Sequence, residues 1–255
     1  MAFSATRMLM AAGFAGNVPA GYQAALFSSS NSTGSHINIP TTSLSSSGTG
    51  IISMWFNIAA IQSPNGNSLF SLTTNTGGTL ACSTNPGSSP ASLSLAIGSN
   101  GSPNANNTTT HLVTTNGWFN LLSSWNGGTG AFTVYVNGTG PGSVGGTVSG
   151  ISIPYATTGP FIIGFFSGNA SALNGCVSEF YFAPGQFLDF TNSSNRALFY
   201  NSGTPVNLGT TGQTPTGTSP AIYWKGAYNN LTNLGTIGGS FTAGGDALTN
   251  CSSAP

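Results

Sequence analysis

The sequence has almost no charge. Of its 255 residues, three are Lys or Arg and three are Asp or Glu, so the formal net charge is zero. An average chain of this length would carry about 64 charged residues, because roughly a quarter of residues in ordinary proteins are charged. Three scattered cations cannot form the basic surface that neutralises phosphates, so a nucleic-acid-binding protein is excluded. The charged residues are Arg7, Arg196, Lys225, Glu179, Asp189 and Asp246.

Groups that titrate or bind metals are equally scarce. Metal sites need clustered carboxylates, thiolates or imidazoles, and acid–base catalysis needs paired titratable groups. His36 and His111 lie in segments rich in Ser, Thr and Asn, where we expect exposed loop residues with no acidic neighbour. No Gly-x-Ser-x-Gly elbow of a serine hydrolase occurs in a strand–turn–helix context. We therefore expect no catalytic residue, no metal ligand and no cofactor.

Cysteine and long apolar runs are also in short supply. Cys82, Cys176 and Cys251 are an odd number and show no CxxC spacing, so we expect thiols and not a structural disulfide. No apolar run approaches the roughly 20 residues of a membrane span, so no membrane partner is expected. The run from Met8 to Ala12 is short for the core of a signal peptide. We expect residues 1–24 to form an N-terminal arm that is retained.

What the chain does have is hydrophobic residues in alternation. They make up 38% of it, including 16 Phe, and their period of two is typical of half-buried strands. Asn137 and Gly138 follow one such strand and supply the positive φ angles of a tight hairpin turn. Many short strands separated by Gly, Ser, Asn and Pro predict an all-β sandwich over residues 25–185. The clearest strands are residues 51–58, 91–97, 118–125, 132–136, 161–166 and 176–182.

The alternating pattern of apolar residues weakens after Pro184 and Gly185. Residues 186–255 show fewer regular strands, and Ala197–Tyr200 is the best candidate for a short helix. Seventy residues with so little regular structure are too few to fold as an independent domain. We therefore expect a C-terminal extension that packs on the sandwich through its apolar residues.

Two neighbouring stretches resemble a known family. Gly117–Trp125, followed by Phe132–Gly138, resembles the central hairpin of laminin G-like, concanavalin A-like jelly rolls. Ile52–Phe56 is similar to the strand before it, and Gly175–Phe182 to the closing strand, with Glu179 at the family's usual acidic position. The resemblance implies a jelly roll of two antiparallel sheets. It gives structural roles to Trp118 and Trp125 on one strand and to Asn137 and Gly138 in the turn.

A second set of segments resembles laminin G-like proteins encoded by bacteriophages and prophages. In the C-terminal part it includes Asp189, Arg196–Tyr200, Gly203–Gly209, Pro220–Gly226 and Asn233–Gly239, and Arg7–Gly13 fits the N-terminal arm of those proteins. This resemblance implies a phage origin but no activity, because the fold hosts lectins, hydrolases and scaffolds. Since Glu179, Asp189 and Arg196 fall in the family-like segments, we expect them to make internal structural contacts.

Three chemical alternatives remain open. Glycoside hydrolysis needs two flanking carboxylates, and Glu179 has no acidic neighbour two or four residues away, so we expect it to bind loop amides, Arg196 or Lys225. A calcium site of low charge could be built from Asn side chains and carbonyl groups. Sugar binding without metal would use loop aromatic residues, for which Tyr22, Tyr155 and Tyr228 are the candidates. The four Trp residues are expected in the core or at an interface.

A neutral surface favours association, because it neither repels nor steers its neighbours. Assembly through such a surface would depend little on pH or salt. We expect a non-enzymatic virion structural protein, a capsid decoration or accessory subunit on the exterior of a phage particle. It would bind other virion proteins, first the major capsid protein, and form homo-oligomers. The alternative is a glycan- or receptor-binding module of a fibre, tail or head that recognises a host surface glycan.

Overall fold

A computed structural model describes residues 22–28, 34–62, 66–73, 79–84, 90–99, 105–156, 159–166 and 171–255. Of the expected N-terminal arm, only residues 22–24 are within the described part; the remainder, with Arg7, lies outside it. The side chains of residues 106–111 also lie outside, although their backbone is described.

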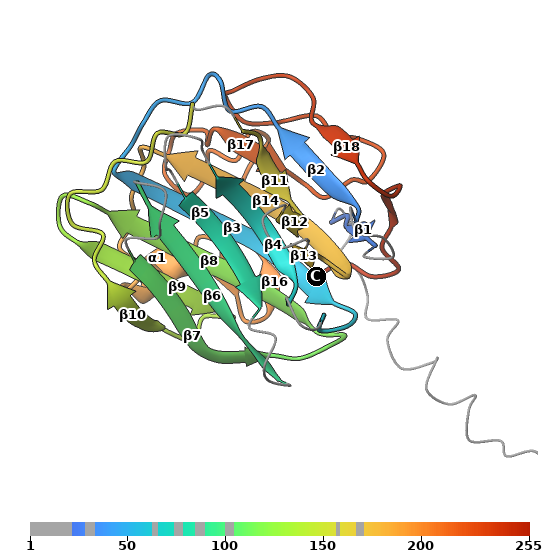
Figure 1. Ribbon diagram of the computed structural model, residues 1–255, viewed down its shortest axis with the longest axis horizontal. Coiled ribbons are helices and arrows are strands. Elements are labelled where there is room, and N and C mark those ends of the chain that lie inside the picture. The colour runs from blue at the N-terminus through green and yellow to red at the C-terminus, as the bar shows by residue number, and fades with distance from the viewer. Residues whose placement is uncertain are drawn as a thin grey trace, which may run out of the picture.

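The chain folds into two large antiparallel sheets packed face to face (Figure 1). This confirms the predicted all-β jelly-roll sandwich. The seven-stranded sheet has the order β19 (Thr249–Asn250), β1 (Ala25–Phe27), β14 (Gly175–Pro184), β3 (Thr49–Ile58), β8 (Trp118–Asn126) and β9 (Ala131–Val136), with β17 (Ile222–Trp224) also paired to β14.

The second sheet has eight strands. Its order is β10 (Ser143–Gly146), β7 (Ala105–Val113), β6 (Ala91–Gly98), β5 (Thr79–Thr84), β4 (Ser68–Thr73), β11 (Phe161–Ile163), β2 (His36–Ile39) and β18 (Thr242–Gly244). Two small hairpins, β12 (Phe165–Phe166) with β13 (Ser171–Ala172) and β15 (Tyr200–Asn201) with β16 (Thr204–Pro205), complete the strands.

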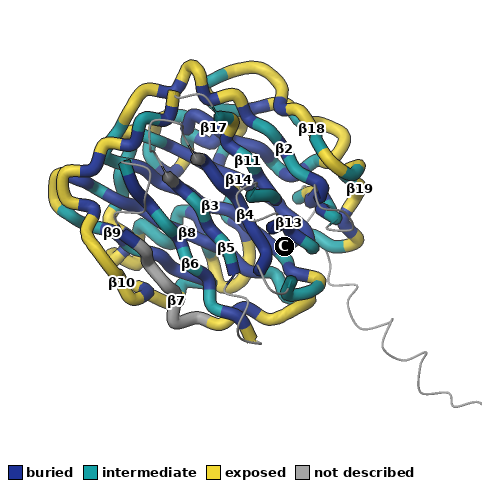
Figure 2. Tube along the Cα trace, in the orientation of Figure 1, coloured by how far each residue is buried: buried dark blue, intermediate teal, exposed yellow. Residues whose placement is uncertain are grey.

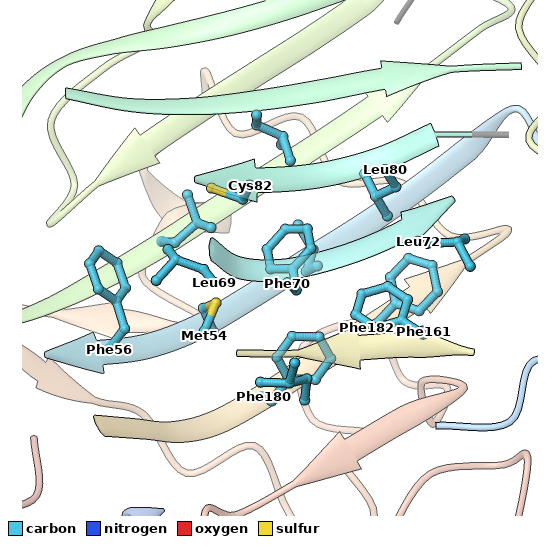
Figure 3. Close-up of a cluster of buried hydrophobic side chains, with 14 of the residues drawn as sticks. Met54, Phe56, Leu69, Phe70, Leu72, Leu80, Cys82, Phe161, Phe180 and Phe182 are labelled. Atoms are coloured by element: carbon cyan, nitrogen blue, oxygen red, sulfur yellow. The ribbon is translucent and has the colours of Figure 1, made fainter. Parts of the chain in front are cut away.

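The main core lies between the two sheets and follows the alternation of the sequence. On β3, Met54 and Phe56 point into it, and on β8 so does Trp125. Across the gap, Phe70 of β4 stacks on Phe161 of β11 at 5.7 Å between ring centroids. Phe180 of β14 packs edge-on against both of these rings (Figure 3). One residue in two along each strand is therefore apolar because that face meets the opposite sheet.

The predicted strand over residues 161–166 is wrong at its centre. Gly164 takes a φ of +86°, and a Cβ there would overlap the ring of Phe27. The chain turns at this glycine, so β11 ends at Ile163 and β12 begins at Phe165. The close approach of the Phe27 ring and the positive φ together require a residue without a side chain at this position.

The turn after β9 has the expected form. Asn137 and Gly138 have φ angles of +50° and +73°, and the backbones of Val136 and Thr139 exchange two hydrogen bonds of 2.9 and 3.0 Å. The Oδ1 of Asn137 also accepts a 2.7 Å bond from the backbone N–H of Asn120 on β8. The Asn side chain thus ties the turn to the neighbouring strand.

Residues 186–255 contribute to both sheets and cover one of them. They supply β17 and β19 to the seven-stranded sheet and β18 to the eight-stranded sheet. Phe190, Phe199 and Leu208 form a second cluster on the outer face of the seven-stranded sheet, against residues such as Tyr181 and Leu122. Figure 2 shows that exposed positions gather in the loops at the rim of the molecule, while positions along the strands are mostly buried or intermediate.

The short helix of this extension lies earlier than predicted. It is α1 (Ser193–Arg196), and Ala197 is its C-cap residue, so the expected helix over 197–200 is wrong. Asn192 begins the helix because its side-chain oxygen accepts a 2.9 Å bond from the N–H of Ser194. Tyr200 instead pairs with Pro205 as part of β15.

Cys176 and Cys251 form a disulfide, so the expectation of three free thiols is wrong. The two residues are 75 positions apart, and spacing alone did not reveal the pairing. Both β14 and β19 pair with β1, and the N–H of Cys251 bonds to the carbonyl of Ala24. The sheet therefore brings the cysteines together. Cys82 is a free thiol in the core, where burial raises its pKa.

Candidate functional site

Glu179 has the least ordinary environment of the predicted site residues. It lies where the register between β14 and β3 shifts, in a β-bulge between Ser178 and Tyr181. Its φ of +49° is in the left-handed region, which is costly for a residue other than glycine. Its side chain is 3% exposed. A strained backbone and a buried carboxyl at one position are features that cluster at functional sites.

Three other side chains complete what we call the Glu179 cluster: Tyr22, Tyr223 and Lys225. The hydroxyl of Tyr223 donates a 2.6 Å hydrogen bond to Oε2 of Glu179. The Lys225 ammonium lies 6.0 Å from the centre of the Tyr223 ring, and its charge acts on the same carboxyl. The expected ion-pair partner Lys225 is therefore nearby, but the hydrogen bond comes from a tyrosine and not from a loop amide.

Burial dominates the electrostatics of this cluster. Removal of the Glu179 carboxyl from water raises its pKa to about 7, while the Tyr223 hydrogen bond and the Lys225 charge act to lower it. Burial also raises the pKa of Tyr223, and the adjacent carboxylate raises it further. The pKa of Tyr22 is raised by burial and by Glu179. The carboxyl thus titrates near neutral pH, well above an ordinary glutamate.

The cluster does not have the composition of a glycosidase site. Glycoside hydrolysis uses two carboxyl groups on either side of the bond, and Glu179 is the only carboxyl residue in this cluster. The nearest acidic residue along the chain, Asp189, is exposed and accepts bonds of 2.6 and 2.9 Å from the hydroxyl and N–H of Thr191. These bonds lower its pKa. Within the described residues, no three His, Cys, Asp or Glu side chains gather as a metal site would need.

Arg196 bonds to the backbone and not to Glu179. Its Nη1 donates to the carbonyl oxygens of Phe190 and Thr191 at 2.6 and 3.1 Å. Its guanidinium lies 4.6 Å from the centre of the Tyr135 ring on β9. Arg196 therefore links the end of α1 to the segment just before it and packs the extension against the seven-stranded sheet through Tyr135.

The two predicted tryptophans on β8 differ in burial. Trp125 is fully buried in the main core and stacks on Phe182 at 6.5 Å. Trp118 is half-buried beside the disulfide, and its indole N–H donates a 3.1 Å bond to the hydroxyl of Ser253. With Trp55 and Trp224 also buried, the expectation that tryptophans are core residues is confirmed for three of the four.

The histidines do not lie in exposed loops, so that expectation is wrong. His36 begins β2, is half-buried and stacks on Phe165 at 5.4 Å between ring centroids. His111 lies in β7, and its side chain is outside the described part. The Ser- and Asn-rich surroundings that suggested loops belong to strands whose outer faces are polar.

The aromatic residues proposed for sugar stacking are mostly engaged. Tyr155 is fully buried, packed edge-on against Phe182, so its assignment to an exposed loop surface is wrong. Tyr22 is half-buried, and its hydroxyl donates to the carbonyl of Pro205. Tyr228 is 39% exposed. The sequence could not separate these cases, because each tyrosine lies outside the regular alternation that reports which side of a strand is buried.

The outer face of the eight-stranded sheet is the second candidate surface. Side chains that point away from the core on neighbouring strands are uncharged, and several of them are small. The register places Ile162 opposite Asn38, Ala81 opposite Ala96, and Ser83 opposite Ser94. These six residues, which we call the open face, are half-buried, in contrast to the covered face of the other sheet. No Asp, Glu, Lys or Arg occurs in any strand of this sheet.

Comparison with known proteins agrees with this architecture. Residues 31–185, more than half of the chain, match the laminin G-3 family, described as the concanavalin A-like lectin/glucanases superfamily. The chain therefore belongs to that superfamily. None of the curated proteins matches it.

Several solved structures are similar to this chain. A candidate carbohydrate-binding protein from Bacteroides ovatus is 15% identical with a TM-score of 0.57; the alignment covers 91% of this chain and 61% of the other. A heptameric SAP-like pentraxin from Limulus polyphemus is 16% identical, with a TM-score of 0.46 and coverage of 88% and 97%. Domain 4 of an extracellular arabinanase from Geobacillus stearothermophilus, in complex with arabinotriose, is 17% identical, with a TM-score of 0.44 and coverage of 62% and 70%.

The likeness to the Bacteroides protein shows the lectin-like jelly-roll fold. The chain spans about three fifths of the Bacteroides protein's length. Among the described residues, no helix has the length and apolar character needed to cross a membrane.

Proposed function

We propose that this chain is a non-enzymatic structural protein of a bacteriophage virion, a decoration or accessory subunit on the capsid surface. The observation that carries this proposal is the open face, defined above by Asn38, Ala81, Ser83, Ser94, Ala96 and Ile162. Its six residues are half-buried on the outer side of the sheet, and none of them is charged or aromatic.

A surface of this composition suits contact with another protein. Small side chains let a neighbouring subunit approach the sheet closely, and Ser and Asn offer hydrogen bonds without the cost of desolvating an ion. In a particle, each subunit meets many neighbours, and an uncharged face avoids repulsion between identical copies. The proposed partners are the major capsid protein and further copies of this chain, on the exterior of the particle.

The opposite side of the sandwich has a different character. There the C-terminal extension covers the sheet with Phe190, Phe199 and Leu208. The resemblance of this extension to laminin G-like proteins of phages and prophages supports the proposed origin. An extension fastened by the Cys176–Cys251 disulfide suits a protein that must survive outside a cell.

Glycan or receptor binding in a fibre, tail or head is the second candidate. Membership of a lectin superfamily and the exposed ring of Tyr228 favour it. Sugar rings usually need an aromatic platform, and the open face has none, so the structural role is better supported. A glycan array with the full chain tests this candidate directly, and its host surface glycan would appear as a specific, competable signal.

Quantitative mass spectrometry of purified particles tests the main proposal. A decoration subunit is expected at tens to hundreds of copies per particle, and only a few copies would indicate an adhesin at a tip. Absence from particles would overturn the proposal.

A pair of lysine variants tests the open face. Ala96→Lys places a charge at its centre, and Thr210→Lys places the same charge on an exposed position of the extension. We expect the first variant to lose particle binding and the second to retain it, with both folding normally. Binding should also change less than twofold between low and high salt, because no ion pair crosses the interface. Normal binding by Ala96→Lys, or release by salt, would show that this face is not the contact.

A further inference from the structure

The short segment that precedes β1 is held in a seat made by three distant parts of the chain. The hydroxyl of Tyr22 donates to the carbonyl of Pro205 at 3.3 Å. The hydroxyl of Ser178 donates to the carbonyl of Gln23, and the N–H of Cys251 donates to the carbonyl of Ala24 at 3.0 Å. Residues 22–24 form no strand of their own, so these bonds carry their attachment to the molecule.

Two residues that contact this segment are direct neighbours, along the chain, of residues in the Glu179 cluster. Ser178, which binds Gln23, is the residue immediately before Glu179 in the bulge of β14. Gly226, which follows Lys225, packs so closely on the carbonyl of Gln23 that a Cβ would overlap it. Tyr22 lies near enough to the carboxyl for the charge of Glu179 to raise the pKa of the Tyr22 hydroxyl. The same few residues therefore enclose Glu179 and fix the N-terminal segment.

We propose that Glu179 is a pH-responsive latch for this segment: its neutral carboxyl keeps residues 22–24 seated, and its ionised form weakens the seat. An ionised carboxylate buried among aromatic rings lacks the hydration it would have in water. Tyr22 is half-buried and Gln23 is exposed, so lifting the segment of residues 22–24 would admit water to the carboxyl.

The other groups that act on this carboxyl belong to two elements. Tyr223 lies on β17 and Lys225 directly follows it, and both favour the ionised form. Tyr22 comes from the N-terminal segment. The Tyr223 hydrogen bond and the Lys225 charge do not outweigh burial, because the pKa of Glu179 is still raised from 4.5 to about 7. Burial and the Glu179 charge raise the pKa values of Tyr22 and Tyr223, so both hydroxyls stay protonated between pH 4 and 8, and Glu179 is the group that switches.

The sign of the effect follows from linkage. When the segment lifts, the carboxyl meets water and its pKa falls toward 4.5. Between pH 4.5 and 7 the lifted state has lost the proton and the seated state has not, so raising the pH favours lifting. The equilibrium constant for lifting should rise about tenfold per pH unit in this window. Above pH 7 both states are ionised, and the curve should level off.

Hydrogen–deuterium exchange of the full chain tests the latch. The readout is the protection of the peptide covering residues 22–27, corrected for the intrinsic pH dependence of exchange, at pH 5, 6, 7 and 8. We expect protection in the wild type to fall by ten- to a hundredfold between pH 5 and 7 and then to stay level. Glu179→Gln keeps an acceptor for Tyr223 without a charge, so its protection should stay flat and high.

Two control variants separate the latch from a general loss of stability. Asp189→Asn removes an exposed carboxylate and should behave as the wild type. Ser178→Ala removes the bond to Gln23, so protection should fall at every pH with the slope unchanged. The peptide covering residues 118–126 of β8 reports global unfolding and should show no such slope. A flat wild-type curve, a slope that survives in Glu179→Gln, or an equal slope in β8 would overturn the proposal.

Discussion

The hydroxyl of Tyr223 on β17 lies 2.6 Å from Oε2 of Glu179 in the bulge of β14. This bond joins the C-terminal extension to the central strand of the seven-stranded sheet. It places one of only six charged residues of the chain in a buried structural contact. In a protein with so few ionic groups, the pH dependence of stability should trace largely to this pair.

Tyr223→Phe should destabilise the protein in a pH-dependent way. The variant leaves Glu179 without its donor, which raises the pKa of the carboxyl above about 7. At pH 8 the wild-type carboxyl is ionised, and loss of a bond to a charged group costs about 1.5–3 kcal/mol. At pH 5 the carboxyl is neutral and the cost falls to about 0.5–1.5 kcal/mol. Urea denaturation at both pH values measures the difference, and Tyr228→Phe serves as an exposed control. Equal losses at the two pH values would contradict the assignment.

Removal of the Cys176–Cys251 disulfide should destabilise the fold by about 2–4 kcal/mol, because the bond closes a long loop in the unfolded chain. The double variant Cys176→Ser with Cys251→Ser should melt at a lower temperature than the wild type in calorimetry. Adding a reductant should lower the melting temperature of the wild type and leave that of the double variant unchanged. A wild type that does not respond to reductant would show that the bond does not form in solution.

Arg196→Lys should loosen the extension while it preserves the charge. The lysine cannot reproduce the planar guanidinium that bonds two carbonyl groups and rests on the Tyr135 ring. We expect a loss of about 1–2 kcal/mol from the hydrogen bonds and the cation–π contact. Chemical denaturation measures it, and protease cleavage within residues 188–200 should accelerate. Lys225→Arg is the matched control, with an effect under about 0.5 kcal/mol for a side chain that is half-exposed. If the two variants behaved alike, the contacts of Arg196 would be incidental.

Asn137 offers a comparison between backbone strain and a side-chain bond. Asn137→Gly keeps the positive φ but loses the 2.7 Å bond to the N–H of Asn120, at a cost of about 1 kcal/mol. Asn137→Ala loses the bond and also places an alanine in the left-handed region, which adds about 1–2 kcal/mol to the loss of stability. Thermal unfolding of the two variants should therefore rank glycine above alanine. The reverse order would mean that the turn changes type when Asn137 is replaced.

Much of the fold could be predicted from local patterns. Alternation along β3, β6 and β8 identified the strands and the core-facing residues, because one side of each strand must meet the opposite sheet. The Asn137–Gly138 pair identified its turn because few residues adopt positive φ. The strand break at Gly164 was missed, since the need for glycine there comes from the ring of Phe27, which is remote in sequence.

The candidate site was predicted less completely. Glu179 stood out by its position, but its partner Tyr223 is 44 residues away and had no distinguishing pattern. Tyr22, Tyr155 and Tyr228 lie outside the alternating segments, and only the packing showed that Tyr155 is buried and Tyr228 exposed.

The sequence by itself determined the class of structure and what the protein lacks. Alternation requires a sandwich, and six charged residues leave too few groups for most catalytic or ionic sites. The tertiary structure decided everything that depends on distant residues meeting. It paired Cys176 with Cys251, placed the C-terminal extension over one sheet, and buried Glu179 against the hydroxyl of Tyr223. The physical reason is that periodicity reports which side of a strand is apolar, whereas contacts depend on how strands far apart in the chain are ordered in the sheets.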